Sequence, residues 1–426
     1  MTARQTALKA LSAVRRSGGF SQDVLSAAIT AGGLDARDAA LCSRIVGSVL
    51  QNTALLDFAI GKYSSVPVKK LEPQVLDILR LSAAQLLFLD RVPGHSAVAE
   101  GVELCKKVCP RAAGLTNAVL RRISERPEAA LAVPGEGTAD YLALRYSHPL
   151  WLAETLMAER GYAFTEAFFA ANNAIVPVTA QVNTLKTTGA ELAKRLTSHG
   201  VQVSPGDRED TLLLTGAGEL TGLPEFREGL FYVQDAAARA AVELTGAQPG
   251  MRVLDGCAAP GGKSFAAALR MRNTGSIVAC DVSEKKLPRI QSGAARLGIS
   301  IVETRAMDGR APDGDLLGAF DAVIADCPCS GLGVIRKKPE IRCKTPEEIA
   351  PLPDIQLAIL TGLSRCVRPG GVLLYSTCTV LTAENMDVAR RFLGENSDFR
   401  LDEWAEFWPH LQETDGFFVC RMIRSI

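Results

Sequence analysis

Beyond about residue 236, short apolar runs typical of strands alternate with stretches of helical spacing, and this alternation constrains the fold more than any other feature. It predicts a parallel, doubly wound α/β sheet, because strands and helices that alternate along a chain form crossover units. The runs cover residues 252–256, 276–281, 299–305, 320–326 and 371–377. In such sheets ligands bind at the carboxyl ends of the strands. The residues that follow each run are therefore the first candidates for a functional site.

The first 128 residues have a different pattern, in which apolar residues recur at helical spacing and prolines separate the segments. Between the two regions, strand-like runs at 176–182 and 211–214 accompany helical stretches at 150–160 and 189–199. We therefore predict a multidomain chain. Its parts are an all-α domain over 1–128, a linker over 129–149, a small α+β domain over 150–235 and an α/β domain over 236–426.

The charge balance restricts how the chain can bind nucleic acid. It carries 47 Lys and Arg against 47 Asp and Glu, so the formal net charge is zero. A general polyanion-binding protein is usually basic, so any such contact has to come from local clusters. Arg336, Lys337, Lys338, Arg342 and Lys344 form the cluster of interest, because they follow the motif around Cys329. Other basic pairs, such as Lys69-Lys70, Lys106-Lys107 and Arg121-Arg122, are usually solvated faces.

The cysteines indicate the redox environment. There are 11, an odd number, scattered through apolar runs, which predicts free thiols in a reducing cytoplasm. No apolar run reaches about 18 residues, and the N-terminus has no signal-peptide pattern, so we expect a cytoplasmic chain without a membrane span. Cys105 and Cys109 lack a second pair of ligands nearby and are better explained as core residues than as a zinc site. No metal is predicted.

A glycine-rich turn follows the first strand of the α/β region. Its sequence is Asp255-Gly256-Cys257-Ala258-Ala259-Pro260-Gly261-Gly262-Lys263-Ser264. A phosphate-binding P-loop requires glycine where Cys257 stands, and a dinucleotide fingerprint requires glycine where Ala258 stands. An S-adenosylmethionine loop requires an acid at the strand end and a compact turn, which Asp255, Gly261 and Gly262 supply. We therefore predict that Asp255 and residues 257–263 bind S-adenosylmethionine.

Acids also follow the next strands. Asp281 ends the second strand, where a carboxylate can accept hydrogen bonds from both ribose hydroxyls. Asp308 follows the third strand and is placed to accept from an adenine amino group. Each acid alone could be a capping residue, but three at successive strand ends favour a methyl donor over a nicotinamide cofactor. Asp326 ends the fourth strand and is assigned to the same pocket.

Two cysteines follow neighbouring strands. The fourth strand runs into Asp326-Cys327-Pro328-Cys329, and the fifth runs into Ser376-Thr377-Cys378. Adjacent strand ends place Cys329 and Cys378 opposite each other, beside the cofactor. A pair of buried, inert cysteines is the alternative, but both stand in polar turns, which favours a reactive role.

Such a pair suits methylation of a cytosine at carbon-5, which is a poor nucleophile unaided. A thiolate that adds to carbon-6 makes carbon-5 reactive, and a base then removes the carbon-5 proton so that the thiolate leaves. A nearby cation favours the ionised thiol, and Lys263 or residues 336–338 can supply it. Asp326 is placed to bind the N3–N4 edge of the ring. The base has to be unstacked or flipped out to enter the site.

Several motifs together resemble one known family. They are Arg145-Tyr146-Ser147-His148-Pro149 with Trp151, Val233-Gln234-Asp235, the loop 257–263, Asp326-Cys327-Pro328-Cys329-Ser330, Gly333-Val334-Ile335-Arg336, Ser376-Thr377-Cys378, Glu384-Asn385 and Asp415-Gly416-Phe417-Phe418. In this set the chain resembles bacterial RNA cytosine-5 methyltransferases of the Sun/Nol/Nop group, in the branch that acts on small-subunit ribosomal RNA. The resemblance covers nearly the whole chain.

The resemblance also implies roles for the other parts. Leu79-Arg80, Gln85-Leu86, Leu89-Asp90-Arg91-Val92-Pro93 and Asn117-Ala118-Val119-Leu120-Arg121 resemble a NusB-type RNA-binding domain. Residues 150–235 would be an accessory RNA-binding domain, with Cys378 as nucleophile and Cys329 as the release residue. The implied partner is ribosomal RNA, and we expect a monomer. Cys327, Lys338 and Cys343 depart from the residues common in the family, which affects the RNA contacts rather than the chemistry.

Four alternatives stay open at this point. A DNA cytosine-5 methyltransferase would use Cys329 as its nucleophile, but its recognition region usually lies within or after the catalytic domain. A transfer RNA methyltransferase would share the chemistry. A P-loop nucleotidase would use residues 320–326 as an acid-ended strand. A non-catalytic NusB-like RNA-binding factor would not need the intact loop and both thiols.

Overall fold

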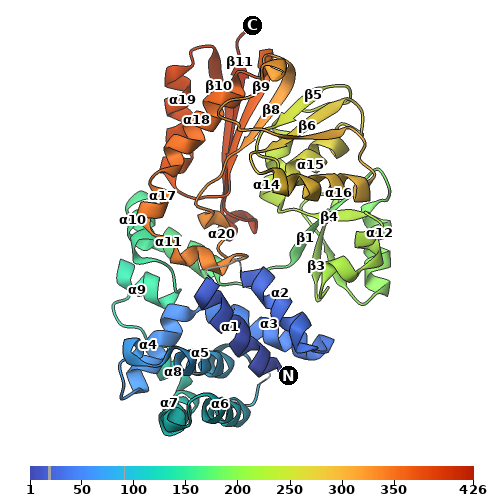
Figure 1. Ribbon diagram of the computed structural model, residues 1–426. Helices are drawn as coiled ribbons and strands as arrows, with labels where there is room; N and C mark the ends of the chain where they lie inside the picture. The colour runs from blue at the N-terminus through green and yellow to red at the C-terminus, as the bar shows by residue number, and fades with distance from the viewer. Residues whose placement is uncertain (18–20, 91) are drawn as a thin grey trace. The chain divides into compact units, whose positions relative to one another are not determined.

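The computed structural model describes residues 1–17, 21–90 and 92–426. Arg91, which belongs to the motif at 89–93, therefore lies outside the described residues. The chain divides into two compact units, one of residues 1–174 and 335–344 and one of residues 175–334 and 345–426. In the described part of the chain, the first unit contains helices and no strand, whereas the second contains two sheets (Figure 1).

The first unit is a helical bundle built around α5 (Pro73–Phe88). This helix is buried on nearly every side, with Ile78, Leu79 and Leu81 fully buried, as expected for a central helix. α1, α3, α4, α6 and α7 pack around it. The other helices are α1 (Ala3–Ser17), α2 (Ser21–Gly32), α3 (Ala36–Gln51), α4 (Thr53–Tyr63), α6 (Gly94–Val108), α7 (Ala113–Glu125), α8 (Pro127–Ala130), α9 (Ala139–Arg145), α10 (Leu150–Arg160) and α11 (Tyr162–Asn172).

The helical unit extends to the end of α11. α10 and α11 pack with α9 and belong to the helical unit, so the small sheet begins only after them. Among the described residues, no single helix is long and apolar enough to cross a membrane. α3 and α4 pass that test only as a pair, across a bend of 81°.

The small sheet of the second unit is antiparallel, in the order β2-β3-β1-β4. Its strands are β1 (Val178–Val182), β2 (Gln202–Pro205), β3 (Thr211–Thr215) and β4 (Phe231–Val233), accompanied by α12 (Gly189–Ser198) and α13 (Pro224–Arg227). Thr188 and Glu191 form a capping box that fixes the start of α12. The Asn183 amide donates to the Leu297 carbonyl at 2.7 Å, which attaches this domain to the large sheet domain.

The large sheet has the order β10-β11-β9-β8-β5-β6-β7. Its strands are β5 (Arg252–Asp255), β6 (Ser276–Asp281), β7 (Val302–Ala306), β8 (Phe320–Asp326), β9 (Val367–Thr377), β10 (Phe399–Phe407) and β11 (Phe417–Arg424). β5 to β9 are parallel, and β11 and β10 add to the β9 edge in antiparallel fashion. The predicted parallel sheet is confirmed, including the adjacency of β8 and β9, whereas the two antiparallel strands were not predicted.

Alternate residues of these strands face two separate cores, as a doubly covered sheet requires. Val253 and Ile324 pack toward α14 (Ala236–Glu243), α15 (Gly262–Arg270) and α16 (Leu287–Leu297). Leu254 and Val323 pack toward α18 (Leu352–Ser364) and α19 (Met386–Glu395). Figure 1 shows the two helix layers on opposite faces of the sheet. The short helices α17 (Pro346–Ile349) and α20 (Pro409–Gln412) complete the unit.

Candidate active site

The glycine-rich turn leads from β5 into α15, with a geometry that depends on glycine. Gly261 has φ +109, and a Cβ there would lie 2.5 Å from the Phe265 ring, so no other residue fits without displacement. The Ala258 amide donates to the Cys280 carbonyl at 2.7 Å, which ties the turn to β6. The start of α15 therefore lies at the carboxyl end of β5, where the first amides of a helix have no partner within the helix and can bind a ligand.

Asp255 at the end of β5 has an acceptor without a protein partner. One carboxylate oxygen accepts from the Ser264 hydroxyl at 2.6 Å, and the other is buried with no hydrogen bond among the described residues. Burial raises the pKa of Asp255 to about 6. An unpaired buried acceptor beside a glycine turn fits a ligand with an ammonium group, as S-adenosylmethionine has.

Asp281 and Asp308 stand at the carboxyl ends of β6 and β7, as the sequence pattern places them. Asp281 is 6 % exposed; it accepts from the Ser283 amide at 2.9 Å and lies 3.5 Å from the Lys286 ammonium. Asp308 contacts the Arg310 guanidinium at 2.6 Å, and this hydrogen bond lowers the pKa of Asp308. Both side chains are ionic partners of basic residues on their own turns, and both face the same edge of the sheet as Asp255.

Lys263 and Asp326 form an ion pair between α15 and the end of β8. The Lys263 ammonium lies 2.7 Å from the Asp326 carboxylate and 4.9 Å from the centroid of the Phe417 ring. The second Asp326 oxygen accepts from the Ser376 hydroxyl of β9 at 2.8 Å. The predicted cation therefore has a carboxylate as its close partner, which fixes both side chains at the edge of the sheet.

Cys329 and Cys378 come together in the loops that follow β8 and β9. Their sulfur atoms are 3.3 Å apart, and both side chains are half-buried. The hydrogen bond with Cys378, followed by burial, raises the pKa of Cys329. Either sulfur can be the donor of this hydrogen bond, so the two thiols are close enough to share a proton. Cys327, between Asp326 and Pro328, points into the core instead and is 4 % exposed.

A pair of glycines brings a third segment to the cysteine loops. The Gly333 amide donates to the Cys378 carbonyl at 3.0 Å, and the Gly416 amide donates to the Gly333 carbonyl at 2.8 Å. A Cβ on Gly333 would lie 1.9 Å from the Gly416 carbonyl oxygen, so the backbones meet without room for a side chain. The segment before β11, whose function the sequence did not reveal, thus packs against the Cys378 loop.

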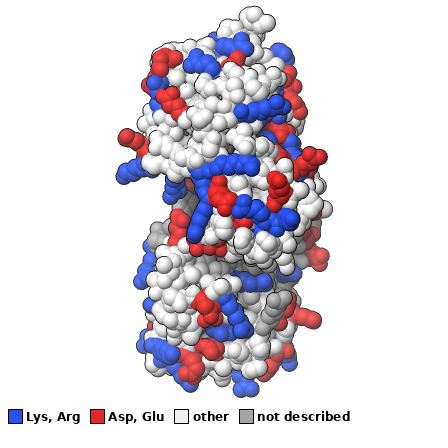
Figure 2. Space-filling view, turned by 90° about the vertical axis from the view of Figure 1, so that its right-hand side faces the viewer, with Lys and Arg blue, Asp and Glu red and all other residues white. Residues whose placement is uncertain are grey.

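The basic run that follows Cys329 does not form one exposed cluster. Residues 335–344 belong to the helical unit, and burial lowers the pKa of Arg342 to about 9. Its guanidinium donates to the carbonyl oxygens of Gln51, Tyr146 and Ser147 at 2.7, 2.8 and 2.9 Å. The prediction of Arg342 as a basic group available to RNA is therefore wrong. Figure 2 shows acidic and basic side chains interspersed on the face that it presents, in keeping with the zero net charge.

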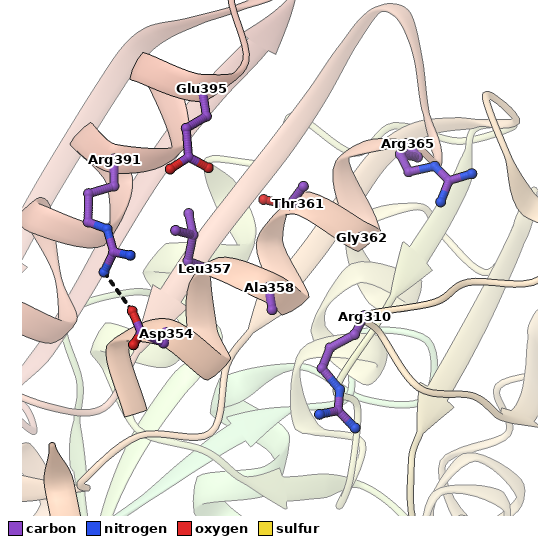
Figure 3. A pocket seen from close by; sticks show the side chains of 9 residues that line it. All are labelled: Arg310, Asp354, Leu357, Ala358, Thr361, Gly362, Arg365, Arg391 and Glu395. Carbon is purple, nitrogen blue, oxygen red and sulfur yellow. Dashed lines mark hydrogen bonds and ion pairs between the residues drawn. The ribbon is translucent and has the colours of Figure 1, made fainter. Parts of the chain in front are cut away.

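An open hollow of about 420 Å³ lies elsewhere, over α18 and α19 (Figure 3). Arg391 and Asp354 face each other across part of it at 2.9 Å, and Arg310 stands at another side. The cysteines, Lys263 and Asp326 do not line it. Arg310, the ion partner of Asp308, is common to this hollow and the predicted cofactor site.

Known families match successive parts of the chain. Residues 243–423 match the family described as 16S rRNA methyltransferase RsmB/F, residues 1–125 match the NusB family, and residues 148–221 match a ferredoxin-like domain of RsmF/B-like methyltransferases. A probable ribosomal RNA small subunit methyltransferase B from Bacillus subtilis is 32% identical over 98% of both chains. The chain belongs to the RsmB/F methyltransferase family. A ribosomal RNA small subunit methyltransferase B from Serratia proteamaculans is 31% identical over 91% of both chains.

Solved structures agree with this family. The crystal structure of PH0851 is 27% identical, with a TM-score of 0.81 over 98% of this chain and 97% of that one. A methyltransferase homologue from Pyrococcus horikoshii is 28% identical, with a TM-score of 0.59 over 66% of this chain and 97% of that one. The predicted family and three-part fold class are confirmed. The RsmB/F family consists of S-adenosylmethionine-dependent methyltransferases, so the predicted cofactor is confirmed and the P-loop alternative is wrong.

Proposed function

We propose that this member of the family methylates carbon-5 of a cytosine in small-subunit ribosomal RNA, with Cys378 as the covalent nucleophile and Cys329 as the release residue. The observation that carries the proposal is the 3.3 Å separation of the two sulfur atoms at the carboxyl ends of adjacent parallel strands. A single cysteine would be enough to form a covalent adduct. A second thiol in contact with it supplies the group that an addition and elimination sequence also needs.

The proposed division of roles requires that the two thiols differ in protonation. The hydrogen bond between them can have either sulfur as its donor, and we assign the proton to Cys329, whose pKa this contact raises. Cys378 is then the thiolate that attacks carbon-6 of the ring, forming a carbon–sulfur bond and leaving carbon-5 nucleophilic. In the last step a basic group takes the carbon-5 proton while the bond between Cys378 and carbon-6 breaks. Cys329, after passing its own proton to solvent, is proposed to be this basic group, because its sulfur lies 3.3 Å from that of Cys378.

Asp326 and Lys263 are proposed to bind the base. Lys263 and Ser376 already contact the two Asp326 oxygens, yet a carboxylate has about four lone-pair sites. One of these can accept the exocyclic amino group of cytosine, a donor that uracil lacks. The ion pair would thereby orient the ring and select cytosine.

The residues proposed to hold S-adenosylmethionine are those that the sequence singled out. Asp255 offers its unpaired oxygen to the ammonium group, the turn 257–263 offers backbone amides, and Asp281 and Asp308 accept from the ribose and the adenine. When bound, S-adenosylmethionine supplies an electrophilic methyl group. The NusB-like residues 1–125 and the ferredoxin-like residues 148–221 are proposed to bind the RNA. The domain limits 1–128, 150–235 and 236–426, with a linker over 129–149, are part of this proposal; the helices at 150–172 pack with the helical unit, and the small sheet begins after them.

The experiment compares wild type with Cys378→Ala and Cys329→Ala on purified small-subunit ribosomal RNA, using bisulfite sequencing and denaturing gels. Wild type should produce 5-methylcytosine. Cys378→Ala should give neither product nor adduct, and Cys329→Ala should accumulate a denaturation-resistant protein–RNA adduct. Cys366→Ala, which removes a fully buried core thiol, is the matched control. An adduct formed by Cys378→Ala and not by Cys329→Ala would reverse the roles, as in DNA cytosine-5 methyltransferases.

A further inference from the structure

Glu384 is a fully buried acid next to the loops that carry Cys329 and Cys378. Neither the sequence nor the family assigns a role to this residue. It ends the short 3-10 helix Thr382–Glu384, and its side chain is 0% exposed. Among the described residues, no salt bridge includes it. A buried carboxylate without a cationic partner is costly unless several donors surround it, so its hydrogen bonds indicate what it is there to hold.

Those hydrogen bonds reach the residue after each cysteine. One Glu384 oxygen accepts from the Ser330 backbone amide at 2.8 Å, directly after Cys329. The other accepts from the Thr379 hydroxyl at 3.1 Å, directly after Cys378. The Ser330 and Thr379 hydroxyls are themselves 2.6 Å apart. One carboxylate therefore joins the two loops at positions adjacent to both sulfur-bearing residues.

Gln356 of α18 extends the connection to the residue before Cys329. Its amide nitrogen donates to Glu384 at 2.9 Å and to the Pro328 carbonyl at 3.0 Å. The Tyr375 hydroxyl donates to the backbone carbonyl of Glu384 and contacts the Gln356 amide oxygen at 3.3 Å. The Cys329 loop is thus held from both sides, at Pro328 and at Ser330, by groups that meet at Glu384.

The negative charge of Glu384 affects the two thiols, in addition to the hydrogen bonds by which Glu384 holds their loops. Its electrostatic contribution adds to the causes that raise the pKa of Cys329. A negative group beside a thiol disfavours the thiolate, so the charge of Glu384 disfavours the ionised form of Cys329. This effect acts in addition to the hydrogen bonds that hold the two loops.

We propose that Glu384 is a positioning residue that sets the separation of the Cys329 and Cys378 sulfur atoms by fixing both loops through one carboxylate. The inference rests on the proposed function for its catalytic consequence, but the spacing of the thiols can be measured without RNA. Because its side chain is fully buried, we assign Glu384 no contact with the substrate. It acts through Ser330, Thr379 and Gln356.

The first test is Glu384→Gln. The glutamine oxygen can still accept from Ser330 and Gln356, but its nitrogen cannot accept from the Thr379 hydroxyl, which would have to accept instead. The substitution therefore removes the negative charge and the Thr379 donation to it while the side-chain volume is preserved. We expect kcat to fall roughly tenfold to hundredfold, as the loss of a hydrogen bond to a charged group implies, while KM for RNA and for S-adenosylmethionine changes little. A residue needed only for folding would lower the amount of folded protein without separating kcat from KM.

The matched control is Asp321→Asn, at the other end of β8. Asp321 accepts from the Arg252 backbone amide at 2.7 Å and pairs with Arg368 at 2.7 Å. Like Glu384→Gln, the Asp321→Asn substitution therefore removes a carboxylate that accepts a backbone N–H. Its kcat should equal that of wild type. Thermal unfolding of all three proteins shows how much stability each change removes.

The second test measures the thiol pair directly, by oxidation with diamide. Diamide takes up two electrons and the two thiol protons to become a hydrazine as the S–S bond forms. Peptide mass mapping then gives the rate at which a Cys329–Cys378 disulfide appears. We expect this rate to fall at least about tenfold in Glu384→Gln, because the reaction needs the close sulfur contact.

The outcomes separate the two proposals. Unchanged kcat and an unchanged cross-linking rate in Glu384→Gln would show that Glu384 does not position the pair. If wild type produces no 5-methylcytosine in ribosomal RNA but cross-linking still slows in Glu384→Gln, the proposed function is wrong and the positioning role stands.

Discussion

Two cations of this protein, the buried Lys263 in the sheet domain and the half-buried Arg342 in the helical unit, are held in opposite ways. Lys263 faces the Asp326 carboxylate at 2.7 Å. Arg342 is surrounded by neutral acceptors, which are backbone carbonyls and the Asn173 side-chain oxygen at 2.6 Å. The ion pair of Lys263 and Asp326 lies at the partly exposed edge of the sheet, where a ligand can replace one of the two partners. The guanidinium of Arg342 is surrounded by carbonyl oxygens and has a structural role. The partners of a basic residue, rather than its distance from the catalytic motif in sequence, indicate its role.

The largest expected effect follows from replacing Arg342. Arg342→Met should lower the free energy of unfolding of the helical unit by roughly 3–5 kcal/mol, because several buried acceptors lose their donors at once. Hydrogen exchange of residues 139–173 and 335–344, followed by mass spectrometry, reports this locally. Arg342→Lys should recover part of the loss, since an ammonium has three donors where a guanidinium has five. Unchanged exchange in Arg342→Met would contradict the structural role.

The buried carboxyl group of Asp255 adds a charge whose effect on the free energy of unfolding depends on pH. Folding raises the pKa of Asp255 from 3.8 to about 6, so between these values the folded state binds more protons than the unfolded state. This group therefore lowers stability as the pH rises from about 4 to about 6, by up to roughly 3 kcal/mol, and leaves it constant above that. The measurement is the free energy of unfolding of wild type and of Asp255→Asn. The difference, wild type minus variant, should fall by up to roughly 3 kcal/mol as the pH rises from about 4 to about 6. A difference independent of pH would show that folding does not raise the pKa of Asp255.

Lys263 should show the reverse of Arg342, with a large effect on activity and a small one on stability. Lys263→Met leaves Asp326 without its cation, and kcat/KM for methyl transfer should fall roughly 100-fold, equivalent to about 2.7 kcal/mol. The change in unfolding free energy should be small, because the Ser376 hydroxyl still contacts Asp326. Arg368→Met, which removes the cation paired with Asp321 at the far end of β8, is the control and should retain full activity.

The smallest effect is expected in the hollow over α18 and α19. Arg391 and Asp354 form an exposed ion pair there, with 49% and 77% of the side chains accessible (Figure 3). Arg391→Ala should change the free energy of unfolding by less than about 1 kcal/mol, because water screens such pairs. Chemical denaturation measures this. A loss comparable with that of Arg342→Met would contradict the contrast between buried and exposed cations.

Local patterns predicted much of the catalytic domain. Apolar runs that end in Asp255, Asp281 and Asp326 predict where strands stop, and parallel strands bring their ends to one edge. The same patterns failed for β10 (Phe399–Phe407), most of whose side chains are exposed or half-buried, because an edge strand gives a weak apolar signal. They also gave no role to Glu384, since its donors come from residues up to 54 positions away.

The sequence by itself determined the order of the elements, the glycine turn and the residues that stand at the strand ends, because these depend on spacing along the chain and on the preferences of single residues. Tertiary structure alone decided that Arg342 is enclosed by the helical unit, that Lys263 is paired with Asp326, and that two sulfur atoms lie 3.3 Å apart. These contacts join polar groups that are far apart in the sequence, so they form only when the chain packs. Burying a polar or charged group without a hydrogen-bond or ionic partner costs free energy, so packing has to bring a partner to each one.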